Sequence, residues 1–126
     1  MTKPLTKPWN PSRGTRIAIA AATLWEWLYV AIFLTMMGGL WFLALTKRSF
    51  PAKGFGPVFG LIFPLHCLTM VLSFVLMAVY LRHAATNDSL TQEQRIAWIL
   101  VLFFANMLAF PVYWWLYLKP DPPPRA

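Results

Sequence analysis

The chain has 126 residues, of which 59% are hydrophobic and 12% are charged, whereas a soluble domain carries about a quarter charged residues. This composition excludes an ordinary soluble fold and predicts an integral membrane protein. The formal net charge is +7, but the bases flank apolar runs, where membrane topology accounts for them, so we expect no nucleic-acid binding. The single cysteine, Cys67, leaves neither an intramolecular disulfide nor a cysteine-based zinc cluster.

The first apolar run predicts a membrane-spanning helix over residues 24–45, because about 20 mostly apolar residues cross a bilayer. A basic lead precedes this run, and Lys47 and Arg48 follow it. The run is longer than the apolar part of a cleaved signal peptide. We therefore expect a retained signal anchor.

Two predictions compete for the start of this helix. Thr23 and Glu26 have the spacing of a capping box, and tryptophans such as Trp25 collect at the lipid headgroups. On that basis the helix starts at the interface, and a short surface helix over residues 10–22, with Asn10 as its cap, precedes it. The competing prediction is one continuous helix from Ile17, in which Glu26 lies deeper and needs a partner.

Two further apolar runs predict spanning helices over residues 58–81 and 96–118, giving an all-α, single-domain membrane protein with three transmembrane helices. The segment before the second run is rich in Pro and Gly, which argues against continuous helix there. Before the third run, Thr91 and Gln94 predict a second capping box and a helix start. The Pro-rich tail over residues 119–126 is expected to be extended.

The third predicted span contains features that disturb a regular helix. Pro111 has no backbone N–H and frees the Met107 carbonyl, so a kink is expected there. Asn106, close to this point, is a candidate for a hydrogen bond between helices. Aromatic residues at the two ends of the spans predict girdles on opposite membrane faces. They are Trp25, Trp27 and Trp98 on one face and Tyr113, Trp114, Trp115 and Tyr117 on the other.

The Lys and Arg residues hardly decide the orientation of a three-span protein. The amino-terminal side would hold six of them and the opposite side five, a near balance under the positive-inside rule. The basic amino-terminal lead favours a cytoplasmic amino terminus in a bacterial inner membrane.

Ionisable side chains within a span are functional candidates, and the chain has two, Glu26 and His66. From the helix rise, they differ in depth by about 15 to 20 Å, so no direct pair between them is expected. We expect Glu26 to meet Arg82 or Arg95 at the interface. Polar residues also follow helical spacing on the second span and should face protein in preference to lipid. These residues are His66, Thr69, Ser73 and Tyr80.

Small residues predict close helix packing within the chain or with partners. Gly39 follows Ala31 and Thr35 at four-residue spacing, and Gly56 and Gly60 form a GxxxG pattern.

The sharper hypothesis for His66 is an axial ligand for haem or a chlorophyll-type pigment, because a neutral imidazole is a common metal ligand. Phe59, Phe63 and Phe74 would flank the ring. A second axial imidazole would have to come from another chain, because His83 lies beyond the span.

The last part of the chain, "MAVYLRHAATNDSLTQEQRIAWILVLFFANMLAFPVYWWLYL", is similar to the two-helix membrane hairpin of phospholipase D-nuclease amino-terminal-type domains and of small uncharacterised bacterial membrane proteins. The matching features are a helix ending in Tyr80 and Arg82, a polar loop, and then Arg95 and Trp98 opening a helix that contains Pro111. The HxK-type motifs of phospholipase D enzymes are absent from the sequence. The resemblance therefore implies an anchor or assembly module without catalytic activity.

The sequence predicts a non-enzymatic accessory or assembly subunit of a larger membrane complex. Its partners would be the lipid bilayer and other membrane subunits or a second copy of the chain, with no cofactor. The alternative is a cofactor-binding subunit of an electron-transfer or light-harvesting complex with His66 as ligand. A lipid-modifying enzyme is a third hypothesis, for which the sequence offers no paired carboxylates, nucleophile–base pair or metal cluster.

Overall fold

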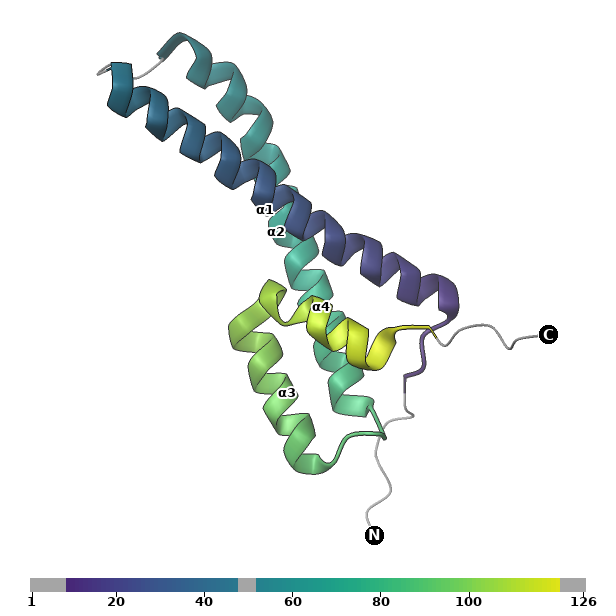
Figure 1. Cartoon of the computed structure of the whole chain (residues 1–126). Coiled ribbons are helices and arrows are strands. Elements are labelled where there is room, and N and C mark those ends of the chain that lie inside the picture. Colours follow the sequence, from purple (N-terminus) through teal and green to yellow (C-terminus); the bar gives the residue numbers. More distant parts are fainter. Residues whose placement is uncertain (1–8, 48–51, 121–126) are drawn as a thin grey trace, which may run out of the picture.

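The computed structural model describes residues 9–47 and 52–120, which form helices and turns without a strand. Two long antiparallel helices cross each other along the length of the molecule, and the described segment that follows them packs against one half of them (Figure 1). The long helices are α1 (Arg13–Lys47) and α2 (Ala52–Thr86). They are followed by α3 (Gln92–Ala105), the 3₁₀ turn η1 (Asn106–Leu108), the short α4 (Phe110–Tyr113) and the π-helical turn η2 (Trp114–Leu118).

Helix α1 is continuous through Thr23, so the predicted capping box and the separate surface helix are wrong. The helix begins at Arg13, where the Ser12 hydroxyl accepts a hydrogen bond from the Thr15 backbone N–H at 3.3 Å. Thr23 instead donates its hydroxyl to the Ile19 carbonyl at 2.9 Å, as a residue in a helix interior does. The competing prediction of one long helix is confirmed, with an earlier start than Ile17.

Helix α2 begins at Ala52, so much of the predicted Pro- and Gly-rich loop is helical. Pro57 and Pro64 lie inside the helix, where each leaves one carbonyl of the preceding turn without its usual donor. Only residues 48–51, which lie outside the described residues, separate the two long helices. So short a connection makes α1 and α2 antiparallel neighbours.

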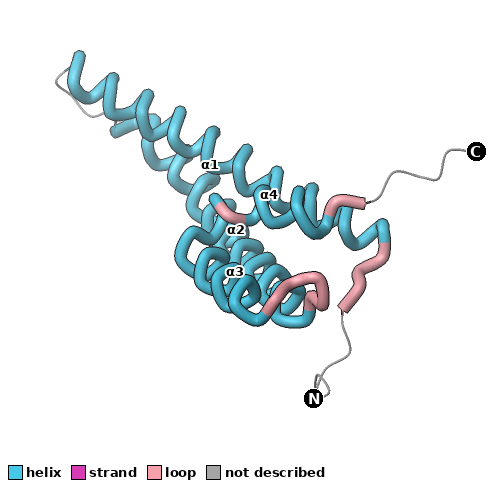
Figure 2. Tube along the Cα trace, turned by 60° about the horizontal axis from the view of Figure 1, so that its bottom comes forward, coloured by secondary structure: helices cyan, strands magenta, loops and turns pink. Residues whose placement is uncertain are grey.

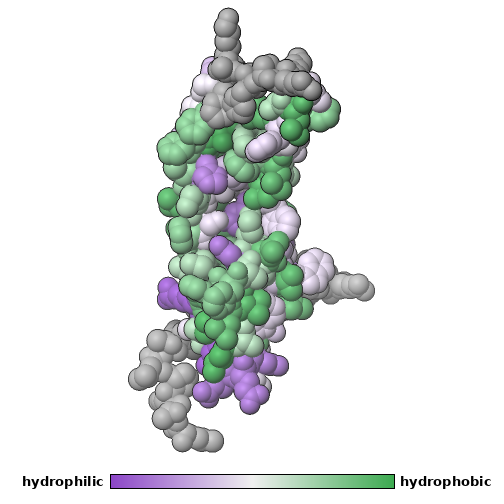
Figure 3. All heavy atoms as spheres, turned by 90° about the vertical axis from the view of Figure 1, so that its left-hand side faces the viewer, coloured by the Kyte–Doolittle hydropathy of each residue, from purple (hydrophilic) through white to green (hydrophobic). Residues whose placement is uncertain are grey.

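Among the described residues, two helices are long and apolar enough to cross a membrane, in place of the three predicted. They cover residues 13–46 and 56–86. Figure 3 shows apolar side chains over most of the height of one face, with polar side chains gathered at the end where α2 turns into α3.

The third predicted span is wrong, because the chain turns back at its centre. Asn106 ends α3 with φ 43° and ψ −119°, a positive-φ conformation near that of the first central residue of a type II′ turn, where Gly, Asn and Asp predominate. Pro111 cannot donate the hydrogen bond that would restore a regular helix across this point. Trp98 near the start of α3 therefore meets Tyr117 in η2, and its indole donates to the Tyr117 hydroxyl at 3.2 Å.

The folded-back segment brings three chain connections to one end of the molecule. Residues 9–12, the α2–α3 turn and residues 119–120 lie at this end (Figure 2). We call this half, in which α3 to η2 pack on α1 and α2, the packed end. Trp114 in η2 links the folded-back segment to α1, because its indole N–H donates a hydrogen bond to the Arg16 carbonyl at 3.0 Å. The predicted aromatic girdles on opposite faces are therefore wrong.

Tyr80 lies at the centre of the core, which occupies the packed end. Its ring stacks on Phe110 at 4.6 Å between centroids and meets the edge of Tyr113 at 5.9 Å. In the other half, which we call the two-helix arm (residues 31–47 and 52–65), no described side chain is buried. Hence the core that fixes the fold lies away from the junction of α1 and α2. The buried core residues are Ile19, Leu76, Tyr80, Ala84, Leu102, Ala109, Phe110, Tyr113 and Leu118.

Candidate functional site

Three side-chain hydrogen bonds join α1 to α2 at successive turns of α1, and we call them the polar ladder. Their partners and distances are Thr23 to Tyr80 at 2.8 Å, Glu26 to Ser73 at 2.5 Å and Tyr29 to His66 at 2.8 Å. The residues repeat every three positions on α1 and every seven on α2. Both spacings keep side chains on one helix face. The prediction that the polar stripe of α2 faces protein is confirmed.

Glu26 is fully buried at the centre of the ladder and accepts a hydrogen bond at Oε1 from the Ser73 hydroxyl. Its second oxygen, Oε2, has no hydrogen-bond partner among the described residues. The predicted ion pair with an arginine is wrong. Arg82 lies over the ring of Trp9 at 5.6 Å, and Arg95 donates to the Asn87 carbonyl at 3.1 Å.

The position of Glu26 along α1 explains why its carboxyl group does not reach Arg82 or Arg95. Since α1 begins at Arg13, Glu26 lies about 20 Å along the helix from its start. Arg82 is nine residues beyond Ser73 on α2, which corresponds to about 14 Å. The carboxyl group therefore lies deep in the helix pair, and the arginines lie at the packed end.

His66 forms the last rung of the ladder, where its Nδ1 atom meets the Tyr29 hydroxyl. The ring of Phe33 stacks on the imidazole at 5.6 Å. As expected, His66 and Glu26 do not pair. Their hydrogen-bond partners place Glu26 and His66 seven residues apart on α2, or about 10 Å, and three residues apart on α1, or about 5 Å. Both values are smaller than the difference in depth that the sequence indicated.

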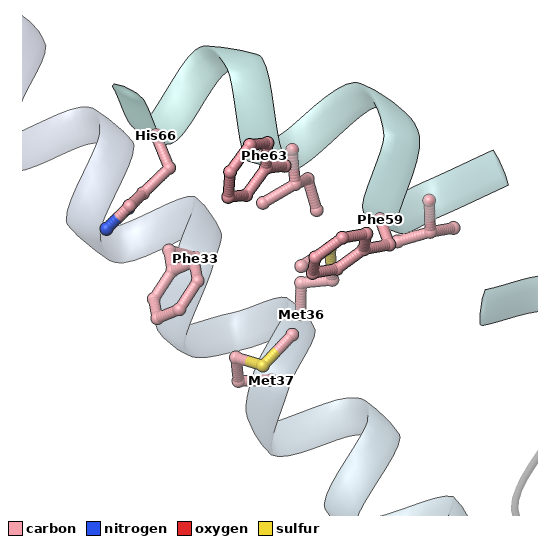
Figure 4. Close-up of a pocket in the computed structure, with 8 residues that line it drawn as sticks. Phe33, Met36, Met37, Phe59, Phe63 and His66 are labelled. Carbon is pink, nitrogen blue, oxygen red and sulfur yellow. The ribbon is translucent and has the colours of Figure 1, made fainter. Parts of the chain in front are cut away.

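A cavity of about 220 Å³ opens beside His66, between α1 and α2 of the two-helix arm. Figure 4 shows His66 and Phe33 at one end of this cavity and Phe59 and Met37 at the other. His66 is the only lining residue whose side chain carries a nitrogen or oxygen atom. Its Nε2 atom has no partner among the described residues. The lining residues are Phe33, Met36, Met37, Val58, Phe59, Ile62, Phe63 and His66.

The break at Asn106 contacts both α1 and α2 through η1. The Met107 carbonyl, which Pro111 leaves free as predicted, accepts a hydrogen bond from the Trp27 indole at 3.2 Å. The side chain of Asn106 does not make the expected bond between helices, because its Oδ1 atom has no partner among the described residues. A backbone carbonyl therefore makes the interhelical contact that the sequence assigned to the asparagine side chain.

Three glycines were predicted to allow close helix packing, and all three lie on the two-helix arm with free space around them. They are Gly39, Gly56 and Gly60. A Cβ atom added at any of them would meet no described atom within 4 Å outside the backbone of its own helix. A Cβ atom added at Gly38 would likewise meet no described atom within 4 Å outside the backbone of its own helix. These positions therefore bring no two of the described helices into close contact.

Sequence reasoning missed several residues of the site. Tyr29, Phe33 and the two methionines of the cavity were not singled out, although Thr23, Glu26 and Tyr29 recur at three-residue spacing in an otherwise apolar helix. That spacing is the signal that could have identified the α1 side of the ladder. At the packed end, the pair formed by His83 Nδ1 and the Tyr113 hydroxyl at 2.9 Å was also missed.

No family model, no curated protein and no solved structure matches this chain. The resemblance of its carboxy-terminal half to a two-helix membrane hairpin stays a prediction. Within residues 9–47 and 52–120, no three His, Cys, Asp or Glu side chains are grouped so that they could hold a metal ion.

Proposed function

We propose that the chain is an integral protein of a bacterial inner membrane, in which α1 and α2 cross the bilayer. The segment from α3 to η2 enters the bilayer from one side and returns to the same side without crossing. The length and apolar character of the two long helices support insertion. The position of η1 against both helices supports the return, because non-helical backbone at membrane depth must be covered by protein.

The returning segment changes the count of basic residues on the two sides. In the sequence, eight of the eleven Lys and Arg residues precede Ile17, lie from Arg82 to Arg95, or follow Leu118, the three stretches that adjoin the packed end. The junction of α1 and α2 has the other three, Lys47, Arg48 and Lys53. Under the positive-inside rule, this imbalance favours a cytoplasmic packed end with both termini on the cytoplasmic side.

Within the membrane, the chain serves as an accessory or assembly subunit that binds other membrane proteins or a second copy of itself. The observation that carries this proposal is the open glycine surface of the two-helix arm. Each glycine in a helix costs about 1 kcal/mol relative to alanine, and no contact with another described helix offsets this cost at Gly39, Gly56 or Gly60. Small residues at such positions allow a neighbouring transmembrane helix to approach closely.

Purification from the native membrane in a gentle detergent tests this proposal, with co-purifying chains identified by mass spectrometry. Gly60→Ile should remove a defined partner, or the second copy, because the new side chain blocks close approach. Ala97→Ile, on the exposed face of α3, is the matched control and should retain the partner. Identical partners in all three preparations would contradict the proposal.

A second proposal retains His66 as the ligand of a haem or chlorophyll-type pigment. The contact between Tyr29 and Nδ1 favours it, because such a contact fixes the ring and leaves Nε2 available. The cavity of about 220 Å³ is small for a macrocycle, however, and a second axial ligand would have to come from another chain. A visible absorption band that is lost in His66→Phe would support this alternative.

A further inference from the structure

The geometry points to the cavity beside His66 as a binding site for the ring of a prenylated quinone. This inference goes beyond the packing role and rests on the proposed membrane location. The cavity lies between the two long helices, and His66 is about three residues from the middle of α2, or about 5 Å along the helix axis. An isoprenoid quinone dissolved in the bilayer interior reaches this depth.

The polar chemistry of the cavity selects the ligand. When the Tyr29 hydroxyl donates to Nδ1, the hydrogen of the neutral imidazole is on Nε2. His66 then carries one hydrogen-bond donor, and the other residues that line the cavity have apolar side chains. A quinone has carbonyl acceptors, no donor and an apolar ring, so it matches this lining. An acyl chain would leave the Nε2 donor unpaired, which costs free energy in an apolar setting.

The walls of the cavity suit a flat ring followed by a hydrocarbon tail. Phe33, which stacks on His66 at 5.6 Å, and Phe63 both line the cavity, so aromatic side chains border the space that a ring would occupy. Met36 and Met37 line the far end, where their flexible side chains can adapt to a tail. A volume of about 220 Å³ suits one ring or two fused rings, with the rest of the tail in lipid.

The test is equilibrium binding of decylubiquinone to the full chain in lipid nanodiscs, with bound quinone quantified by solvent extraction and ultraviolet absorbance. The wild-type protein should bind about one quinone per chain in a saturable manner. His66→Phe, which keeps a ring and removes the donor, should weaken binding by about tenfold, the effect of one hydrogen bond. His66→Gln retains a donor and should restore part of the affinity.

Two further variants test whether quinone binding depends on the cavity itself or on the surface around it. Ile62→Trp fills the cavity and should abolish binding. Cys67→Ser is the matched control, because Cys67 is the exposed neighbour of His66 and does not line the cavity. Its affinity should equal that of the wild type. Circular dichroism and gel filtration of each variant establish that it is folded.

The possible outcomes are distinct. Absence of saturable binding by the folded wild type, or equal binding by the wild type and His66→Phe, would overturn the inference. A haem or pigment band that follows His66 would also overturn it in favour of the second proposal. Carbonate extraction of native membranes tests insertion separately, so failure of the membrane proposal is distinguishable from failure of quinone binding.

Discussion

The Ser73 hydroxyl of α2 donates a hydrogen bond to Oε1 of Glu26, whose carboxyl group is fully buried in the middle of the α1–α2 pair. The other carboxyl oxygen has no partner among the described residues. A buried carboxylate without a positive partner is costly. Glu26 therefore contributes to packing as a hydrogen-bond acceptor, and a negative charge at this position would oppose folding.

Glu26→Gln should leave the stability of the protein in detergent unchanged or raise it. The amide oxygen accepts the Ser73 bond at the same position, and the substitution removes a group that can ionise. Glu26→Leu should be less stable than Glu26→Gln by about 1 kcal/mol, the usual value of a hydrogen bond between membrane helices. Unfolding curves in a denaturing detergent measure both changes. The prediction fails when the leucine variant is the more stable of the two.

Tyr80→Phe should lower the free energy of unfolding by about 1 kcal/mol, because it removes the hydroxyl bonded to Thr23 and retains the ring stacked on Phe110. Tyr80→Ala also removes the ring from the core and should cost about 3–5 kcal/mol. The same unfolding curves separate the two effects. Equal losses in both variants would show that the ring contributes little.

Asn106→Gly should be neutral or stabilising, because Asn106 has φ 43° and glycine adopts positive φ without steric cost. Asn106→Val should destabilise the fold by about 1–3 kcal/mol, since a β-branched residue is strained in this conformation. Thermal melts followed by circular dichroism compare the two variants. A valine variant as stable as the glycine variant would mean that position 106 does not adopt a positive φ.

Local signals in the sequence predicted the start of α3 correctly but not the start of α1. Thr91 and Gln94 form the predicted capping box, with bonds of 3.1 and 3.3 Å. Thr23 and Glu26 have the same spacing and form none. The difference is context, because Thr91 follows the turn-forming residues 87–89, whereas no glycine or proline separates Thr23 from the preceding helical turns. A capping pattern therefore needs a nearby helix end.

Hydropathy alone could not predict that the third apolar run folds back. Residues 96–118 have the length and composition of a span, and Pro111 indicated only a kink. The reversal depends on the backbone of Asn106 and on the Trp27 bond to the Met107 carbonyl, 80 residues apart in sequence. The partner of Glu26 was likewise unpredictable, because its depth depends on where α1 begins. The polar face of α2 was predicted because helical spacing alone determines it.

The folded-back topology is tested most directly by the side of the membrane on which Lys119 lies. Single cysteines at Ser12, Lys47 and Lys119 in a Cys67→Ser background can be labelled in spheroplasts with a membrane-impermeant maleimide. The two-span account predicts labelling of the cysteine at position 47 alone, with positions 12 and 119 protected until the membrane is permeabilised. Labelling at position 119 together with position 47 would show that the third run crosses the bilayer, and would contradict the account.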